Sequence, residues 1–220
     1  MSTKGERTRQ HLMDVAIAAF ERDGFANTSM RALAKEAGVS VGLAYRYFDA
    51  KEAIVLAFYE QKAEELLQVP VTGGTLGARF HSVMRARFTL LRPHHRAMSA
   101  VLAAMLDPEG PVGALSPATA RLRGMTQQVL RDAISGTPGL RADLHEPLLH
   151  ISWLGHLLLM LAWVQRPDAA EQLTERVAAG LDMAQPFLGM PFAKQALTNA
   201  AGALAGFVEL GPTSEAGPPA

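Results

Sequence analysis

The chain contains no cysteine among its 220 residues. This absence excludes disulfide bonds, thiolate zinc sites and cysteine nucleophiles, and it suits a reducing compartment. Long runs of β-branched residues are also missing, whereas the helix formers Ala, Leu, Met, Arg, Glu and Gln dominate. We therefore expect an all-α protein.

Net charge is zero. This counts against a protein that holds nucleic acid through a large positive potential over its whole surface, so any such contact must be local. The sequence also has no P-loop, dinucleotide fingerprint or nucleophile elbow, and its histidines do not fall at the spacing of shared metal ligands. We predict no catalytic residue, no cofactor and no metal site.

No apolar segment typical of a signal peptide follows the charged start MSTKGERTRQ, so we predict a cytoplasmic protein. One stretch, residues 147–165, lacks Asp, Glu, Lys and Arg, and about 20 such residues can cross a bilayer. Pro147 opens this stretch, and His150 and His156 interrupt it. We favour a helix buried in protein over a membrane span.

The first fifty residues show the pattern of short helices joined by tight turns. Apolar residues recur at helical spacing from Arg7 to Phe20, and Gly24 supplies a left-handed stop. Thr28 and Ser29 can cap a second helix. The inner face of that helix, which ends at Gly38, is expected to hold Met30, Leu33, Ala34 and Ala37.

A third helix follows after only two linking residues. Ser40 can cap it, and Ala44 and Phe48 are expected to point inward. Asp49 and Glu52 form a capping-box pattern that predicts the start of a fourth helix.

Two short helices joined by a glycine-containing turn form the helix-turn-helix layout, whose second helix enters the major groove. In that position Arg46 can bond guanine or phosphate, and Val41 and Leu43 can meet thymine methyls. The hydroxyls of Tyr45 and Tyr47 can reach phosphate oxygens. Short helices with glycine turns also occur in ordinary all-α proteins, where these tyrosines would pack against neighbouring helices.

Residues 16–54, AIAAFERDGFANTSMRALAKEAGVSVGLAYRYFDAKEAI, carry a longer pattern. They match A-x-x-x-F-x-x-x-G-[FY] followed by T-[ST]-x-x-x-[IL]-A-x-x-[AL]-G-V-S-x-G-x-x-Y-x-[HY]-F-x-x-K-[ED] without a gap. This stretch closely resembles the DNA-binding domain of the tetracycline-repressor (TetR) family of bacterial regulators. The resemblance implies DNA contacts, which fall on Thr28, Ser29, Arg31, Ser40, Val41, Gly42, Leu43, Tyr45, Arg46, Tyr47 and Lys51.

The resemblance also divides these residues by role. Thr28 and Ser29 look like phosphate ligands, and Tyr45, Tyr47 and Lys51 resemble the clamp on the DNA backbone. Base or groove readers are expected at Arg31, Val41, Gly42, Leu43 and Arg46. Many members carry a polar pair where this chain has Val41 and Leu43, so hydrogen-bonded readout is expected to depend on Arg31 and Arg46.

The Pro/Gly break QVPVTGGT, residues 68–75, predicts the domain junction. We expect a DNA-binding domain over residues 1–52, a fourth helix over 50–67 that connects the domains, and a larger helical domain over 68–210. The tail, residues 211–220, has the composition of a disordered segment.

Within the larger domain we expect helices over residues 76–92, from Pro93, over 117–135 and from Pro147. DPEGPVG closes the second of these. The interior face of the first is expected to hold Leu76, Phe80, Val83, Met84, Phe88 and Leu91.

A helix that is apolar all round, such as residues 147–165, needs partners on every side. The next helix has an apolar face expected to point inward, formed by Leu173, Val177, Leu181, Ala184 and Leu188. As the family resemblance implies, we predict a homodimer through residues of about 147–165 and 169–188 that form a four-helix interface. Such a dimer predicts a near-palindromic operator with half-sites about 34 Å, or a multiple of it, apart.

The resemblance further implies a small-molecule effector, and the composition suits a largely apolar one. The predicted ligand-binding residues are Met84, Phe88, Met98, Met105, Met125, Trp153, His156 and Met160. The same residues can equally fill an ordinary core. No acid occurs between Glu65 and Asp107, where five arginines do, so the effector could also carry a carboxylate or phosphate bound by Arg79, Arg85, Arg87, Arg92 or Arg96.

Together these patterns predict a ligand-responsive, DNA-binding transcriptional regulator that acts as a repressor. Two alternatives stay open at this point. One is a regulator controlled by a protein partner, and the other is an apolar-ligand carrier or enzyme of helical fold that does not bind DNA.

Overall fold

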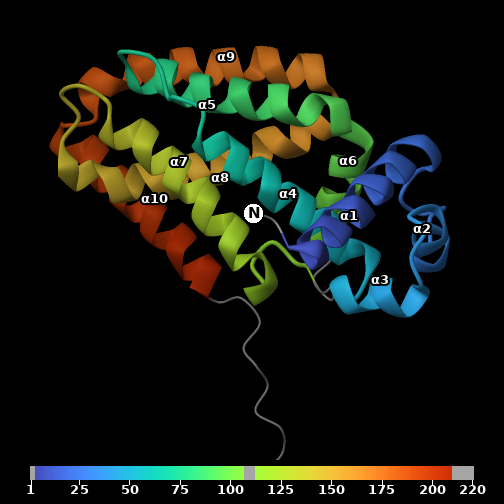
Figure 1. Ribbon diagram of the computed structural model, residues 1–220. Helices are drawn as coiled ribbons and strands as arrows, with labels where there is room; N and C mark the ends of the chain where they lie inside the picture. The colour runs from blue at the N-terminus through green and yellow to red at the C-terminus, as the bar shows by residue number, and fades with distance from the viewer. Residues whose placement is uncertain (1–2, 107–111, 210–220) are drawn as a thin grey trace, which may run out of the picture.

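The structure is a computed structural model that describes residues 3–106 and 112–209, with side chains described up to residue 203. The described residues are helical throughout (Figure 1), which confirms the all-α prediction. The helices are α1 (Lys4–Asp23), α2 (Met30–Glu36), α3 (Val41–Tyr47), α4 (Lys51–Leu67), α5 (Leu76–Leu91), α6 (His95–Leu106), α7 (Ala120–Ser135), α8 (His145–Gln165), α9 (Pro167–Ala184) and α10 (Pro191–Glu209). Short 3₁₀ turns precede α6, α7 and α8 and follow α9.

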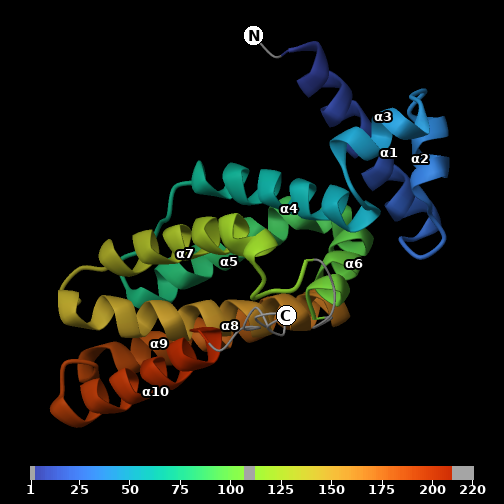
Figure 2. The ribbon, with the colours of Figure 1, turned by 90° about the horizontal axis from the view of Figure 1, so that it is seen from below.

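Helices α1, α2 and α3 lie together at one end of the molecule, beside the larger body formed by α5 to α10 (Figures 1 and 2). Helix α4 runs from the small end into the body, where it contacts α5, α6 and α7. Helix α1 reaches the body separately, through α6. Two helices therefore connect the two parts.

The three N-terminal helices form as their sequence predicts, with one boundary difference. Helix α1 begins at Lys4, ahead of the expected Arg7, because Thr3 and Glu6 form a capping box that supplies partners for the first amides. Gly38, with φ 67°, ends α2 as expected. The residues predicted to face inward from α2 and α3 are all buried: Met30, Leu33, Ala34, Ala37, Ala44 and Phe48.

The capping box predicted from Asp49 and Glu52 is wrong. The N-cap of α4 is Ala50, which makes no side-chain hydrogen bond to the helix, so α4 starts at Lys51. A tertiary contact holds this end in place of a local cap. The Lys51 ammonium donates to the carbonyl oxygens of Phe25 (2.8 Å) and Thr28, in the turn between α1 and α2.

Helix α5 buries all six of its predicted interior residues, and the prediction for α9 holds in part. Leu188 is buried after the end of α9, and Val177 and Leu181 pack against the core, but Leu173 and Ala184 are exposed. The residues of α9 that are fully buried are instead Ala170, Thr174 and Ala178. The reason is close helix packing: a Cβ atom on Gly77 of α5 would lie 2.0 Å from the Ala178 carbonyl oxygen, and only small side chains fit between backbones this close.

Two expected helix starts at proline shift slightly. Pro93 lies in a 3₁₀ turn before α6, and α8 begins at His145, two residues ahead of Pro147. Part of DPEGPVG and the tail predicted to be disordered lie outside the described residues. Among the described residues, one segment, Ala142–Gln165, is long and apolar enough to cross a membrane, but its helix α8 packs against α6, α7, α9 and α10, as a core helix does.

Candidate nucleic-acid interface and effector cavity

The outward surface of α3 is unusually rich in large side chains for an exposed helix. Tyr45 is 50% exposed, and Val41, Gly42 and Arg46 are also exposed, while Leu43 is half-buried. The inward residues Ala44 and Phe48 hold the opposite side of the helix in the core. This arrangement leaves one helix face with an arginine, a tyrosine and apolar side chains available to another molecule.

Two of the arginines at this end of the molecule, one on α2 and one on α3, have no side-chain partner among the described residues. Arg31 on α2 and Arg46 on α3 are exposed and form no ion pair or side-chain hydrogen bond with any described residue. A guanidinium in this state keeps its full set of donors for a base edge or a phosphate. By contrast, Arg9 of α1 packs its guanidinium over the Phe48 ring, at 4.7 Å from its centre.

The hydroxyl side chains in this region first serve local structure. Ser29 accepts from the Ala32 amide and caps α2, and Ser40 accepts from the Leu43 amide and caps α3. Thr28 is buried, and its hydroxyl donates to the Gly24 carbonyl at 2.7 Å. Ser29 and Ser40 stay exposed at helix N-termini, where backbone amides favour anions.

Tyr45, Tyr47 and Lys51 were expected to contact the DNA backbone together, but Lys51 and Tyr47 are less free to do so than the exposed Tyr45. The Lys51 ammonium binds the two carbonyls of the α1–α2 turn and lies over the Phe25 ring, at 4.2 Å from its centre. This ammonium therefore makes contacts within the domain that connect the start of α4 to the α1–α2 turn. Tyr47 is half-buried, with its hydroxyl beside Gly5 of α1, so packing against a neighbouring helix explains part of its position.

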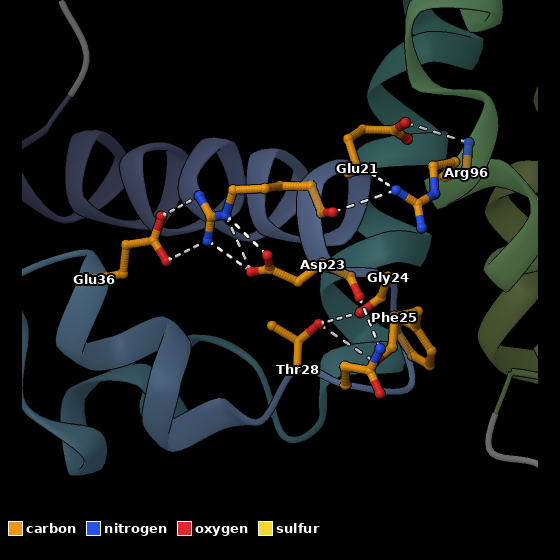
Figure 3. A network of polar contacts seen from close by, with 9 residues as sticks. Glu21, Asp23, Gly24, Phe25, Thr28, Glu36 and Arg96 are labelled. Atoms are coloured by element: carbon orange, nitrogen blue, oxygen red, sulfur yellow. Dashed lines mark hydrogen bonds and ion pairs between the residues drawn. The ribbon is translucent and has the colours of Figure 1, made fainter.

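An ion-pair network joins the C-terminal ends of α1 and α2 (Figure 3). Arg22 donates to both oxygens of Glu36, at 3.0 Å each, and also to Asp23. These hydrogen bonds lower the pKa values of Glu36 and Asp23 below their usual range and raise the pKa of Arg22. The pairs are exposed, so they orient the two helices more than they stabilise them.

A second set of contacts joins α1 to α6, at the border between the small end and the body (Figure 3). The Glu21 carboxylate accepts from the Ala97 amide at 2.6 Å and from the Arg96 amide at 3.4 Å. In return the Arg96 guanidinium donates to the Glu21 carbonyl at 2.6 Å and to the Arg22 carbonyl at 3.3 Å. An acid thus meets the first turn of α6 and a cation the last turn of α1, as the helix dipoles favour.

The body contains a largely apolar cavity of about 20 Å³, bordered by α4, α6, α7 and α8. This volume is close to what a single water needs. Four predicted ligand-binding residues line it: Met105, Trp153, His156 and Met160. The other four do not, and Met84, Phe88, Met98 and Met125 belong to or pack against the core, with the Phe88 ring stacked on Trp163.

Sequence reasoning missed the polar residues of this cavity. Tyr59 of α4 and Thr126 of α7 line it, and both accept hydrogen bonds from Arg87, at 3.2 and 3.4 Å. Arg123 lines it too and donates to the Ala114 carbonyl at 2.9 Å. The arginine-rich, acid-free stretch was the available signal, but it did not indicate which arginine is buried.

His156 is 3% exposed, and neither of its ring nitrogens has a hydrogen-bond partner. Burial, and secondly the positive charge of Arg87, lower the pKa of His156 well below its ordinary value. The imidazole is therefore neutral at pH 7, with one N–H donor and one acceptor nitrogen facing the cavity region.

The five arginines singled out from the sequence differ in their burial and in their hydrogen-bond partners. Arg79 donates to the carbonyls at the end of α7, Arg92 pairs with Glu171, and Arg96 binds the end of α1. Arg85 is exposed and has no side-chain partner among the described residues. Arg87 is the buried member, 2% exposed, with no carboxylate in ion-pair range in the part of the chain described.

Comparison with curated proteins matches the N-terminal end. The chain is 34% identical over 67 residues to the HTH-type transcriptional regulator UidR of Escherichia coli strain K12, across 30% of this chain and 34% of UidR. It is 37% identical over 57 residues to AcrR of Shigella flexneri, across 26% of each protein. The matched region thus spans about a third of UidR and a quarter of AcrR.

Comparison with solved structures extends the likeness to the whole fold. A tetR-family transcriptional regulator from Streptomyces coelicolor aligns with a TM-score of 0.58 and 24% identity, over 98% of this chain and 93% of that one. FadR of Thermus thermophilus, solved in complex with lauroyl-CoA, aligns with a TM-score of 0.54 and 20% identity, over 96% and 99% of the two chains. At these identities the likeness shows a shared fold.

The family model for bacterial regulatory proteins of the tetR family matches residues 12–58, which contain α2, α3 and the capped turn between them. This family consists of transcription regulators and not of enzymes, so the prediction of a non-enzyme is confirmed. Residues 12–58 of the chain therefore form a helix-turn-helix domain of the tetR family of bacterial regulatory proteins.

Proposed function

We propose that this regulator is a cytoplasmic repressor that binds a near-palindromic operator as a homodimer and is released by a small, largely apolar effector. The observation that carries the proposal is the outward face of α3, with Arg46 free of any intramolecular partner among the described residues. Arg46 and Arg31 read base edges, while Val41 and Leu43 contact thymine methyls.

Backbone contacts come from the same end of the molecule. The Tyr45 hydroxyl, the capped N-termini of α2 and α3 and the exposed hydroxyls of Ser29 and Ser40 are placed to bind phosphate oxygens. Lys51 supports this surface indirectly, by fixing the α1–α2 turn against the start of α4. Gly42 lets the DNA backbone or a base approach α3 closely, since it has no side chain and a Cβ atom there would meet no described residue within 4 Å.

Dimerisation is supported by the apolar residues that α8 and α9 leave on the surface. Leu158 is 59% exposed, and Leu161 and Leu173 are exposed as well. A second copy of the same pair of helices would cover these leucines in a four-helix interface. Two α3 helices related by a two-fold axis then face successive major grooves, which requires a near-palindromic site.

The effector is proposed to enter the cavity between α4, α6, α7 and α8. FadR of Thermus thermophilus, a repressor of the same fold, binds lauroyl-CoA, which supports an apolar ligand in such a body. The cavity is too small for such a molecule without movement of its walls, and Met105 and Met160 are unbranched side chains that repack readily.

Movement of the walls can reach the DNA-binding end by two routes. Tyr59 lies on α4, whose first residues abut the α1–α2 turn, and Met105 lies on α6, whose first turn binds Glu21 of α1. An effector that favours one arrangement of these helices by about 10⁴-fold over the other would shift the regulator almost completely between its two states.

Selection of bound duplexes from a random pool tests the proposal. The unaltered chain should enrich a near-palindrome. Arg46→Ala should lose the preference at particular base pairs, at a cost of about 1–3 kcal/mol per half-site. Tyr45→Phe, which removes only a phosphate contact, should weaken binding to all duplexes alike by about 1 kcal/mol and keep the base preference.

The two variants form a matched pair, because both residues are exposed on α3 and neither contributes to the core. Equal effects of the two substitutions would contradict the roles assigned to them. Enrichment of no duplex by the unaltered chain would contradict the proposed function as a whole.

A further inference from the structure

The cavity holds more positive charge than its surroundings offset. Of the residues that line it, Arg123 is a cation and none is an acid. Arg87 lies directly behind two of them, Tyr59 and Thr126, and is 2% exposed. No described carboxylate forms an ion pair with either arginine. A buried guanidinium without an anion is costly, which points to a partner that the described residues do not supply.

The hydrogen bonds of Arg87 are weak substitutes for such a partner. Its two terminal nitrogens donate to the hydroxyls of Tyr59 and Thr126 at 3.2 and 3.4 Å, which are long for charged donors. Its Nε–H has no partner among the described residues, and neither do the ring nitrogens of His156. These groups lie around one cavity, because the two hydroxyl partners of Arg87, on Tyr59 and Thr126, line it together with His156.

The rest of the cavity wall is apolar. Leu102, Met105, Leu122, Leu157, Met160 and the ring of Trp153 make up most of it. A ligand that fits both the cationic part and the apolar part of this cavity has a small anionic group, which contacts Arg87, and an apolar body, which contacts these side chains. Because the guanidinium lies inside the helical body, the group must be compact, which suits a carboxylate better than a bulky phosphorylated head group.

We propose that the effector is an amphipathic monocarboxylate, whose carboxylate is bound by Arg87 with the help of Tyr59, Thr126 and His156. This inference rests on the proposed function, in which the cavity between α4, α6, α7 and α8 is the effector site. Binding replaces the bond from Arg87 to the Tyr59 hydroxyl with a stronger one to the carboxylate, and so releases a contact between α5 and α4.

Calorimetric titration of the full chain tests this directly. The probes are hexanoate, octanoate and decanoate, each compared with the primary alcohol of the same length. At least one carboxylate should bind about tenfold or more tightly than its alcohol, as expected for charge-assisted hydrogen bonds in a buried site. Fluorescence of Trp153, which lines the cavity, gives a second readout.

Variants then locate the charge. Arg87→Met should reduce the preference for the carboxylate over the alcohol to about twofold or less, because the apolar wall is kept and the cation is lost. Arg85→Met is the matched control on the same helix: Arg85 is exposed and outside the cavity, so the preference should persist. Decanoyl-CoA, whose chain carries no free carboxylate, should bind more weakly than decanoate.

Several results would overturn the inference. They are equal binding of acid and alcohol by the unaltered chain, binding of none of the acids, and a preference unchanged in Arg87→Met. The first comparison needs no variant, so it holds even if Arg87→Met fails to fold. Duplex selection without any effector tests the proposed function separately. If the chain enriches a palindrome but binds acid and alcohol equally, only the inference that the effector is a carboxylate is overturned.

Discussion

At the scale of single residues, burial separates side chains that the sequence presents as equivalent. Met84 and Met160 both occur in apolar helical patterns, yet the first fills the core and the second lines the cavity. Arg85 and Arg87 are two positions apart on α5, which puts them on different sides of the helix, one exposed and one buried. The function of each depends on the neighbours that the fold brings to it.

His156 gives a prediction at this scale. Because burial lowers its pKa in the folded protein, the unfolded chain binds more protons below pH 6.5, the ordinary pKa of histidine. The resulting stability is fully present above pH 6.5 and is lost as the pH falls. Between pH 7 and pH 5, this histidine alone should lower the free energy of unfolding by an amount that linkage limits to about 2 kcal/mol.

His156→Phe removes the titrating group and leaves a ring of similar shape in the same apolar surroundings. The free energy of unfolding, measured by urea denaturation, should fall less between pH 7 and pH 5 in this variant than in the unaltered chain, by a difference of up to about 2 kcal/mol. His150→Phe, at a half-buried position on the same helix, is the control and should retain the original pH dependence. An unchanged pH dependence in His156→Phe would show that His156 is not neutral in the folded state.

At the scale of helices, the end-to-end contact between α1 and α6 is the most specific link between the two parts of the chain. Glu21 and Arg96 each take part in this contact with both a side chain and a backbone group. Helix α6 also carries Leu102 and Met105 of the cavity wall. In the proposed mechanism, a displacement of α6 by an effector would therefore act on the end of α1 without passing through α4.

Arg96→Ala should weaken this link. The loss of its hydrogen bonds to the Glu21 and Arg22 carbonyls should lower the free energy of unfolding by about 1 kcal/mol, a value discounted for the exposure of the contact. Amide hydrogen exchange should accelerate at the last turn of α1 and the first turn of α6. Arg85→Ala, which removes an arginine without such partners, should change neither quantity, and similar exchange in both variants would contradict the link.

At the scale of the whole molecule, the surface of α8 and α9 is the feature that the isolated chain leaves unexplained. Three leucines are exposed there, although the other helices of the same domain pack closely around α8 and α9: Leu158 and Leu161 on α8, and Leu173 on α9. Small residues on the buried face of α9 let it approach α5 closely, and this packing leaves Leu173 on the outside, whereas Leu181 packs against the core. The outward leucines are what a second copy would bury.

Leu158→Asp combined with Leu173→Asp should yield a folded monomer, because two charges per subunit would be buried without partners in the interface. Sedimentation velocity should show the loss of the dimer, and affinity for the palindromic duplex should fall at least about tenfold, since the two half-sites no longer bind together. Leu106→Asp, at an exposed leucine on α6, is the control and should stay dimeric. A dimer that survives the double substitution would place the interface elsewhere.

Local patterns alone were enough for the helices, the caps at Ser29 and Ser40, the stop at Gly38 and the inward residues of α2, α3 and α5, because these depend on propensity and periodicity within a few turns. The family followed from the same short stretch. Only the tertiary structure decided the start of α4, the buried face of α9, the tie made by Lys51 and the choice of Arg87 among five arginines. Each of these depends on the distance of closest approach between helices far apart in the chain, which helical periodicity does not encode.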